Sequence, residues 1–183
     1  MPDRLTRIVT RKGDTGETAL GDGTRVSKTD PRIALLGDVD ELNSWIGVVL
    51  AHDPGTEIHA LLIGVQHDLF DLGGALSIRG APLLSERHVA RVDAAAAKFN
   101  DGLPPLKEFI LPGGAPILAF LHLARTCCRR VERSAVGLLK DQVNGAHALA
   151  YLNRLSDCLF IAARVEARRL GVPEVYWEKQ NSL

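Results

Sequence analysis

PILAFLHLARTCCRRVERSAVGL, residues 116–138, carries the pattern from which we predict the fold. Apolar residues recur in it at intervals of three and four, which is the period of an α-helix with one buried face. Pro116 suits the first turn of such a helix, because the N–H that proline lacks has no helical partner there. The buried stripe predicted for this helix comprises Leu118, Leu121, Ala124, Cys128, Val131, Ala135 and Leu138.

Four other segments show the same helical period. The first begins at Pro31 and ends near His52, and the second carries its apolar stripe from Ile58 to Leu76. Ser85 is a suitable N-cap for the third, which continues through Phe99, and the last covers residues 146–170 before Gly171. No strand-like alternation of useful length is visible. Five helices with mostly short connections predict an all-α fold, a five-helix bundle.

Length and composition indicate one domain and exclude some classes of partner. A chain of 183 residues that is 46% hydrophobic can bury one sizeable core. Its 22 basic and 22 acidic residues balance, so no overall field attracts nucleic acid or an acidic membrane. No apolar run is long enough to span a membrane, and the first residues are charged where a signal peptide is apolar, so we expect a cytoplasmic protein. We expect residues 1–183 to form a loop over 1–30, the bundle over 31–171 and a tail over 172–183.

The cysteines and histidines give little sign of metal or disulfide chemistry. Cys127 and Cys128 are adjacent and Cys158 stands alone, so neither a disulfide framework nor a CxxC metal motif is present. We expect all three to be buried as small hydrophobic residues. The chain also lacks the Glu-x-x-His pairs that bind metals in di-iron helical bundles, so no protein metal site is predicted.

A row of arginines is the most distinctive polar feature. Arg125, Arg129 and Arg133 follow one another at intervals of four, with Arg130 and Glu132 beside them, so several guanidinium groups share one side of a helix. Such a row can be a solvated face with surface salt bridges. It can equally be a polyphosphate clamp, because planar guanidinium groups match phosphate oxygens. The residues alone leave both interpretations open.

The last helix has a polar side of its own, on which the period places Asn153, Asp157 and Arg164. Alone this is an ordinary amphipathic helix. If this side meets the arginine row, the Asn153 amide could hydrogen-bond a nucleotide.

The first thirty residues contain a second candidate anion site. Thr10-Arg11-Lys12-Gly13-Asp14, with Gly16 and Thr18, offers backbone N–H groups, hydroxyls and positive charge within a short span. The segment is not a Walker A motif, because no GxxxxGK[ST] is present. A flexible tail is the alternative interpretation.

Five motifs in this order resemble the PduO-type ATP:corrinoid adenosyltransferases. They are TRKGDTGET, GDVDELNSWIG, FILPGG, ARTCCRRVER and YLNRLSDCLF, and the resemblance covers residues from about Thr10 to Arg168. It implies an enzyme that transfers the 5′-deoxyadenosyl group of ATP, with Mg²⁺, to cob(I)alamin, giving adenosylcobalamin and triphosphate. It also implies a homotrimer of five-helix bundles with ATP sites at the subunit interfaces.

The same resemblance implies roles for individual residues. Thr10, Arg11, Lys12, Gly13, Thr18 and Lys28 would surround the nucleotide from one subunit, and Arg129, Arg130, Glu132, Arg133 and Asn153 from its neighbour. Arg125 would pair with Asp40 across the interface. Phe109 would lie on the cobalamin side, whereas without the resemblance we would interpret it as a core aromatic residue.

Two other functions compete with catalysis. A carrier or sensor could keep the ATP and corrinoid sites and deliver adenosylcobalamin to a client enzyme without catalysing the transfer. A purely structural helical bundle would bind no ATP. The transferase reading implies a cobalamin reductase and an adenosylcobalamin-dependent client enzyme as partners.

Overall fold

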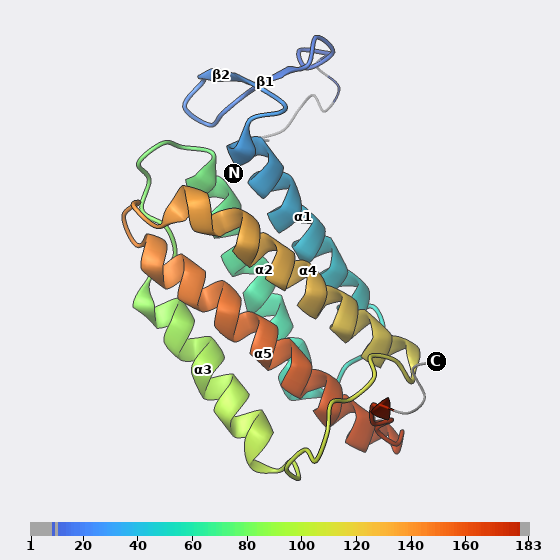
Figure 1. Cartoon of the computed structure of the whole chain (residues 1–183). Coiled ribbons are helices and arrows are strands. Elements are labelled where there is room, and N and C mark those ends of the chain that lie inside the picture. The colour runs from blue at the N-terminus through green and yellow to red at the C-terminus, as the bar shows by residue number, and fades with distance from the viewer. Residues whose placement is uncertain (1–8, 10, 180–183) are drawn as a thin grey trace.

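Five helices and a small hairpin make up the computed structural model, which describes residue 9 and residues 11–179 (Figure 1). The predicted five-helix bundle is confirmed. Its first helix ends two residues earlier than predicted, shortly before Asp53, where the backbone adopts a positive φ of 50°. The helices are α1 (Pro31–Leu50), α2 (Thr56–Leu76), α3 (Glu86–Asp101), α4 (Pro116–Leu139) and α5 (Gly145–Leu170).

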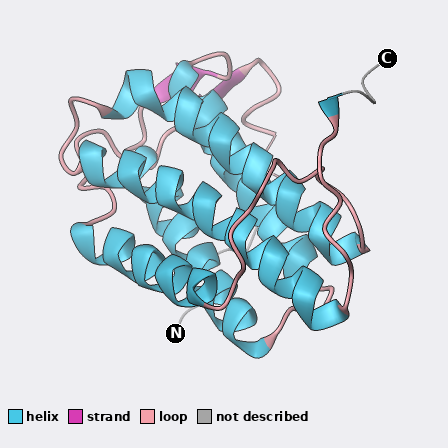
Figure 2. Cartoon of the chain, turned by 60° about the horizontal axis from the view of Figure 1, so that its bottom comes forward, coloured by secondary structure: helices cyan, strands magenta, loops and turns pink. Residues whose placement is uncertain are grey.

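Helix α4 lies at the centre of the packing. It contacts α1 on one side and α5 on the other, while α2 packs on α1 and α3 packs on α5 (Figures 1 and 2). The predicted stripe of α4 is buried as far as Ala135, with Leu121, Ala124, Cys128 and Val131 fully inaccessible to solvent. Leu138, predicted to end the stripe, is half-buried, and Leu139 is buried instead. Of the helices in the described residues, none combines the length and the apolar character that crossing a membrane requires.

A β-hairpin near the N-terminus was not predicted from the sequence. Strand β1 (Glu17–Ala19) pairs antiparallel with β2 (Arg25–Ser27), and Thr18 lies opposite Val26. Three residues are too few to show an alternating pattern. The turn contains Gly23 at φ 84°, a conformation that glycine adopts without strain. The Gly21 N–H donates to the Ser77 carbonyl at 2.7 Å, which attaches the hairpin to the end of α2.

One buried carboxylate joins three helices away from the arginine row. Asp68 of α2 is 4% exposed, and it accepts hydrogen bonds from Tyr151 of α5, at 2.8 Å, and from Arg91 of α3. Burial, followed by the charge of Asp68, raises the pKa of the Tyr151 hydroxyl well above its usual value. The hydroxyl therefore stays protonated and acts as a donor, which fixes α5 against α2.

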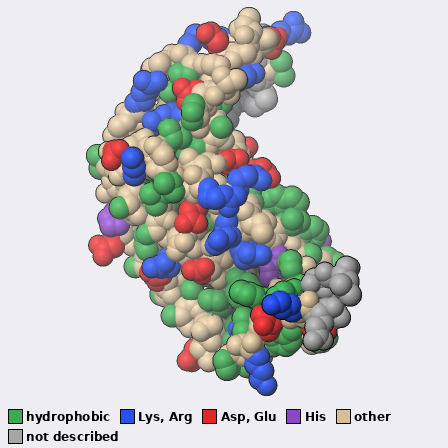
Figure 3. Space-filling view, in the orientation of Figure 1, with side chains coloured by type: hydrophobic (Ala, Val, Ile, Leu, Met, Phe, Trp, Pro, Cys, Tyr) green, Lys and Arg blue, Asp and Glu red, His purple; other side chains and the backbone are tan. Residues whose placement is uncertain are grey.

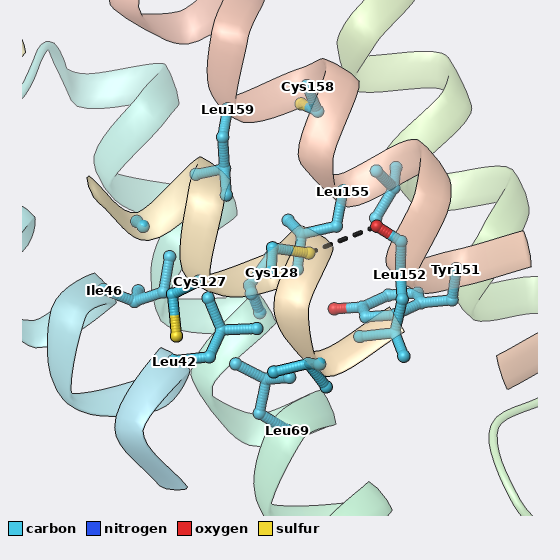
Figure 4. Close-up of a cluster of buried hydrophobic side chains, with 14 of the residues drawn as sticks. Leu42, Ile46, Leu69, Cys127, Cys128, Tyr151, Leu152, Leu155, Cys158 and Leu159 are labelled. Carbon is cyan, nitrogen blue, oxygen red and sulfur yellow. Dashed lines mark hydrogen bonds between the residues drawn. The ribbon is translucent and has the colours of Figure 1, made fainter. Parts of the chain in front are cut away.

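The three cysteines are buried and unpaired, as predicted. Cys128 lies between α4 and α5, where its Sγ donates to the Leu152 carbonyl at 3.2 Å (Figure 4). Burial raises the pKa of Cys127 to about 11 and that of Cys158 to about 12, and it raises the pKa of Cys128 well above the usual range. All three thiols are therefore protonated near neutral pH.

We expect the native protein to resist thiol labelling at pH 8. Because the thiolate is the reactive form and all three sulfurs are buried, a disulfide reagent should modify fewer than one thiol per chain within the time in which it labels free cysteine. In denaturant the same reagent should label three thiols per chain. Rapid labelling of one cysteine in the native protein, identified by mass spectrometry, would contradict the burial described here.

Candidate active site

The arginine row borders a groove between α4 and α5. Arg125 and Arg129 line this groove, which has a volume of about 570 Å³, and residues 103–106 also line it. Basic side chains gather over the middle of the same face of the molecule, with acidic ones beside them (Figure 3). From α5, the groove is lined by Ser156, Asp157, Phe160, Ile161 and Arg164. We call it the α4–α5 groove.

Two cations lie close together in the wall of this groove. Arg125 is half-buried, and its Nε donates to Nδ1 of His122 at 3.4 Å. Burial lowers the pKa of Arg125, and the positive charge of Arg129 lowers it further. Burial also lowers the pKa of His122, and the positive charge of Arg125 lowers it further. A bound anion would relieve this repulsion, so the wall is suited to an anionic ligand.

The other two arginines of the row are held within the chain. Arg130 faces α1, where its Nε lies 3.3 Å from Oδ1 of Asp38 and its Nη2 pairs with Glu41. Arg133 donates from Nη1 to the Arg129 carbonyl at 3.0 Å. The salt-bridge interpretation thus describes Arg130, whereas Arg125 and Arg129 present their charges to the groove.

Asn153 lies beside the arginine row, which is the condition under which its amide could hydrogen-bond a nucleotide. Its Nδ2 donates to Oε1 of Glu132 at 3.0 Å, so the polar side of α5 and the row on α4 are in contact. This hydrogen bond orients both side chains at the edge of the row.

The N-terminal residues assemble a second basic cluster at the hairpin. A Cβ added to Gly13 would lie 3.1 Å from Nζ of Lys28, so the lysine that follows β2 packs closely over Gly13. Arg25 donates to the Lys12 carbonyl at 3.3 Å, and Thr18 lies in β1. Arg11 is exposed, with a positive φ of 58°. The predicted residue Thr10 lies outside the described residues.

Within one chain the hairpin cluster and the arginine row are separate. The hairpin projects beyond the end of the bundle at which α1 begins, whereas residues 125–133 occupy the middle of α4 (Figure 1). A single chain therefore does not combine the two sets of predicted nucleotide contacts.

Asp40 lies away from Arg125 of the same chain, and the partner predicted for it is Arg125 of a neighbouring subunit. It is exposed on α1 and lines a different cavity, of about 190 Å³, between α1 and α2. No ion pair joins it to Arg125 among the residues that the structure describes. Nearby, Phe70 is 69% exposed, and the buried Oδ1 of Asn43 has no hydrogen-bond partner in the described part of the chain. We call this cavity the α1–α2 groove.

Phe109 is exposed, and the interpretation of it as a core aromatic residue is wrong. Its side chain is 76% accessible, on the segment between α3 and α4, residues 102–115, which we call the Phe109 loop. The C-terminal tail, residues 172–179, runs beside this loop (Figure 2). The loop and the tail border a cavity of about 220 Å³ that His122 and Arg164 also line.

Sequence analysis missed several residues that line the α4–α5 groove, Phe160 among them. Phe160 was not singled out, although it follows Asp157 by three positions and therefore shares its side of α5. Arg164 was placed on the polar side of that helix together with Asp157, and both residues line the groove. Its burial was not predicted, since it is only 6% exposed. Among the described residues, no group of three or more His, Cys, Asp or Glu side chains could hold a metal.

Comparison with known proteins identifies the family. The model of the cobalamin adenosyltransferase family matches residues 8–166, and the chain belongs to this family. It is 50% identical to a cobalamin adenosyltransferase of Cupriavidus metallidurans over 98% of both chains, and 46% identical to a corrinoid adenosyltransferase of Mycobacterium tuberculosis over 90% of this chain and 91% of that one.

A solved structure extends the likeness to the whole fold. A variant of the PduO-type ATP:corrinoid adenosyltransferase from Lactobacillus reuteri, complexed with cobalamin and ATP, superposes with a TM-score of 0.86 at 32% identity. The match covers 94% of this chain and 100% of the other. The resemblance inferred from the five motifs is confirmed.

Proposed function

We propose that this chain transfers the 5′-deoxyadenosyl group of ATP to cob(I)alamin, giving adenosylcobalamin and triphosphate. One observation of the structure supports this most directly: the α4–α5 groove joins two arginines to apolar side chains. Arg125 and Arg129 offer charge to a polyphosphate, while Phe160 and Ile161 offer an apolar surface suited to a corrin ring. The names of two related proteins, cobalamin adenosyltransferase and corrinoid adenosyltransferase, agree with adenosyl transfer to a corrinoid.

The reaction is a displacement at carbon. The electron pair of Co(I) attacks C5′ of ATP, the cobalt–carbon bond forms, and the C5′–O bond breaks with its electrons leaving on triphosphate. Negative charge accumulates on the leaving group, and Arg129 with Lys12 and Lys28 would stabilise it. Positioning supplies the rest, because cobalt, C5′ and the leaving oxygen must lie on one line.

Mg²⁺ would enter with the nucleotide. The proposed side chains are mostly cationic, and the only carboxylate among the proposed nucleotide contacts, Glu132, accepts a hydrogen bond from Asn153. Such a set of donors fits a Mg²⁺ whose ligands are phosphate oxygens and water rather than protein groups. When bound, the ion would neutralise part of the triphosphate charge.

A homotrimer would complete the site. The hairpin region of one subunit would approach the arginine row of its neighbour. The first subunit would contribute Thr10, Arg11, Lys12, Gly13, Thr18 and Lys28. The neighbour would contribute Arg129, Arg130, Glu132, Arg133 and Asn153. Arg125 would then meet Asp40 of the adjacent subunit. Phe70 is exposed, and the Asn43 oxygen has no partner among the described residues; both support the proposal that a second copy covers the α1–α2 groove. Residues 1–183 would act as one domain, with Phe109 on the corrinoid side.

An anaerobic assay tests the reaction. Purified protein, chemically reduced cob(I)alamin and Mg-ATP should give adenosylcobalamin, followed by its visible absorbance, together with an equal amount of triphosphate. Saturable binding of ATP and corrinoid without product would favour the carrier, and absence of ATP binding would favour the structural bundle. Chemical reduction replaces the cobalamin reductase that we expect as a partner in the cell.

Replacing Arg129 should impair turnover without unfolding the protein. Because Arg129 is exposed on α4, we expect Arg129→Ala to change the melting temperature by no more than about 2 °C. Loss of a charge-stabilising donor should lower kcat by roughly 100-fold. Arg129→Lys should retain part of the activity, since it keeps the charge but loses the planar fork. The matched control is Arg87→Ala, an exposed arginine of α3, and equal losses in both alanine variants would contradict this role.

Replacing Asp40 should weaken assembly. We expect Asp40→Ala to weaken trimer association by at least about tenfold, as measured by mass photometry across a dilution series. ATP binding should weaken in parallel. Asp141→Ala, an exposed carboxylate in the α4–α5 turn, serves as the control. An unchanged oligomer with unchanged ATP affinity would exclude the proposed cross-subunit pair.

A further inference from the structure

We propose that Arg164 is the positioning residue for the corrinoid side of the site, because it holds the Phe109 loop and the C-terminal tail in one arrangement. This inference rests on the proposed function. It concerns an arginine on the polar side of α5 whose burial the sequence did not predict.

The Arg164 guanidinium contacts both segments at once. Its Nε donates to Oε1 of Glu174 in the tail at 2.7 Å, and its Nη2 donates to the Pro104 carbonyl in the loop at 2.8 Å. Glu174 is itself largely buried, with 17% of its side chain exposed. Removing one member of a buried charged pair leaves the other without compensation, so this contact is a strong constraint on the tail.

The tail in turn fixes the backbone around Phe109. The Leu111 N–H donates to the Val175 carbonyl at 2.8 Å, and the Trp177 N–H donates to the Phe109 carbonyl at 2.7 Å. Phe109 is 76% exposed, so the packing of its own side chain contributes little to its position. Its place therefore depends on the pairing with the tail, and through Glu174 on Arg164.

Arg164 also stands between the two cavities of this region. It lines the α4–α5 groove together with Arg125 and Arg129, and it lines the 220 Å³ cavity that the loop and the tail border. Because its charge is paired with Glu174, it is suited to organising the walls of the site rather than to binding phosphate. We therefore expect it to act on the corrinoid and not on ATP.

Two substitutions test this role by separating the two substrates. Arg164→Lys keeps the charge but loses the fork that reaches both partners, and Glu174→Gln keeps the shape of the side chain but removes the ion pair. Each should raise the KM for cob(I)alamin about tenfold and leave the KM for ATP within about twofold. The double variant should lose less than the product of the two single effects, because both remove one interaction.

The chain offers a matched control on the same helix. Arg169 also binds a carboxylate and a loop carbonyl, with Nη2 at 2.6 Å from Glu166 and at 3.2 Å from the Asp53 carbonyl, but it lines neither cavity. Arg169→Lys should reduce thermal stability to a similar extent and leave both KM values unchanged. If the Arg164 and Glu174 variants change stability alone, or raise both KM values equally, the proposal is overturned.

A second measurement does not depend on catalysis. By hydrogen exchange and mass spectrometry, peptides containing Leu111 and Trp177 should exchange faster in Glu174→Gln than in the unmodified protein, while peptides from α4 should not. Titration of cob(II)alamin, followed by absorbance, should show about tenfold weaker binding. Unmodified protein that makes no product would refute the proposed function alone, whereas unchanged exchange and unchanged cob(II)alamin binding would refute the role of Arg164.

Discussion

The packing of α4 against α5 determines where the polar side chains of both helices can lie. Ala124, Cys128 and Ala135 are fully buried, and Cys128 approaches closely enough to donate to a carbonyl of α5 (Figure 4). Each residue of an α-helix is turned by about 100° from the one before it. Arg125 and Arg129 each follow a buried residue by one position, so burial of the stripe places them at the edge of the α4–α5 contact.

The same rotation explains why neighbouring arginines have different surroundings. Arg130 follows Arg129 and is turned further round the helix, toward α1, where Asp38 and Glu41 compensate its charge. Arg125 stays beside Arg129, and the lowered pKa of Arg125 reflects burial and this unfavourable proximity. A site that keeps two cations together before its ligand arrives is preorganised for an anion, since no charge must be moved during the reaction. The helix packing thus produces the electrostatic property that the proposed reaction needs.

The sequence predicted what depends on helical periodicity and missed what depends on contacts between distant segments. Most of the buried stripe of α4 followed from intervals of three and four. Its start at Pro116 followed from the preference of proline for the first turn of a helix, and the burial of the three cysteines from their small hydrophobic side chains. The hairpin did not, because strands of three residues show no pattern. The burial of Arg164 could not be predicted either, since its partners, Pro104 and Glu174, lie in aperiodic segments 60 residues before it and 10 residues after it. Phe109 was misinterpreted without the family resemblance for the same reason, because its surroundings are set by the tail.

The two sides of the proposed site are consequently held by different forces. Arg125 and Arg129 are attached to a helix whose position is fixed by close packing, and close-packed interiors do not deform gradually. Phe109 is attached to a loop held by backbone pairing with the tail and by the contacts of Arg164. A displacement along one line requires the cobalt to reach C5′ while the triphosphate is held still. Under the proposed reaction, the rigid side would hold the nucleotide, and the side held by a few polar contacts would adjust to the bulky corrinoid.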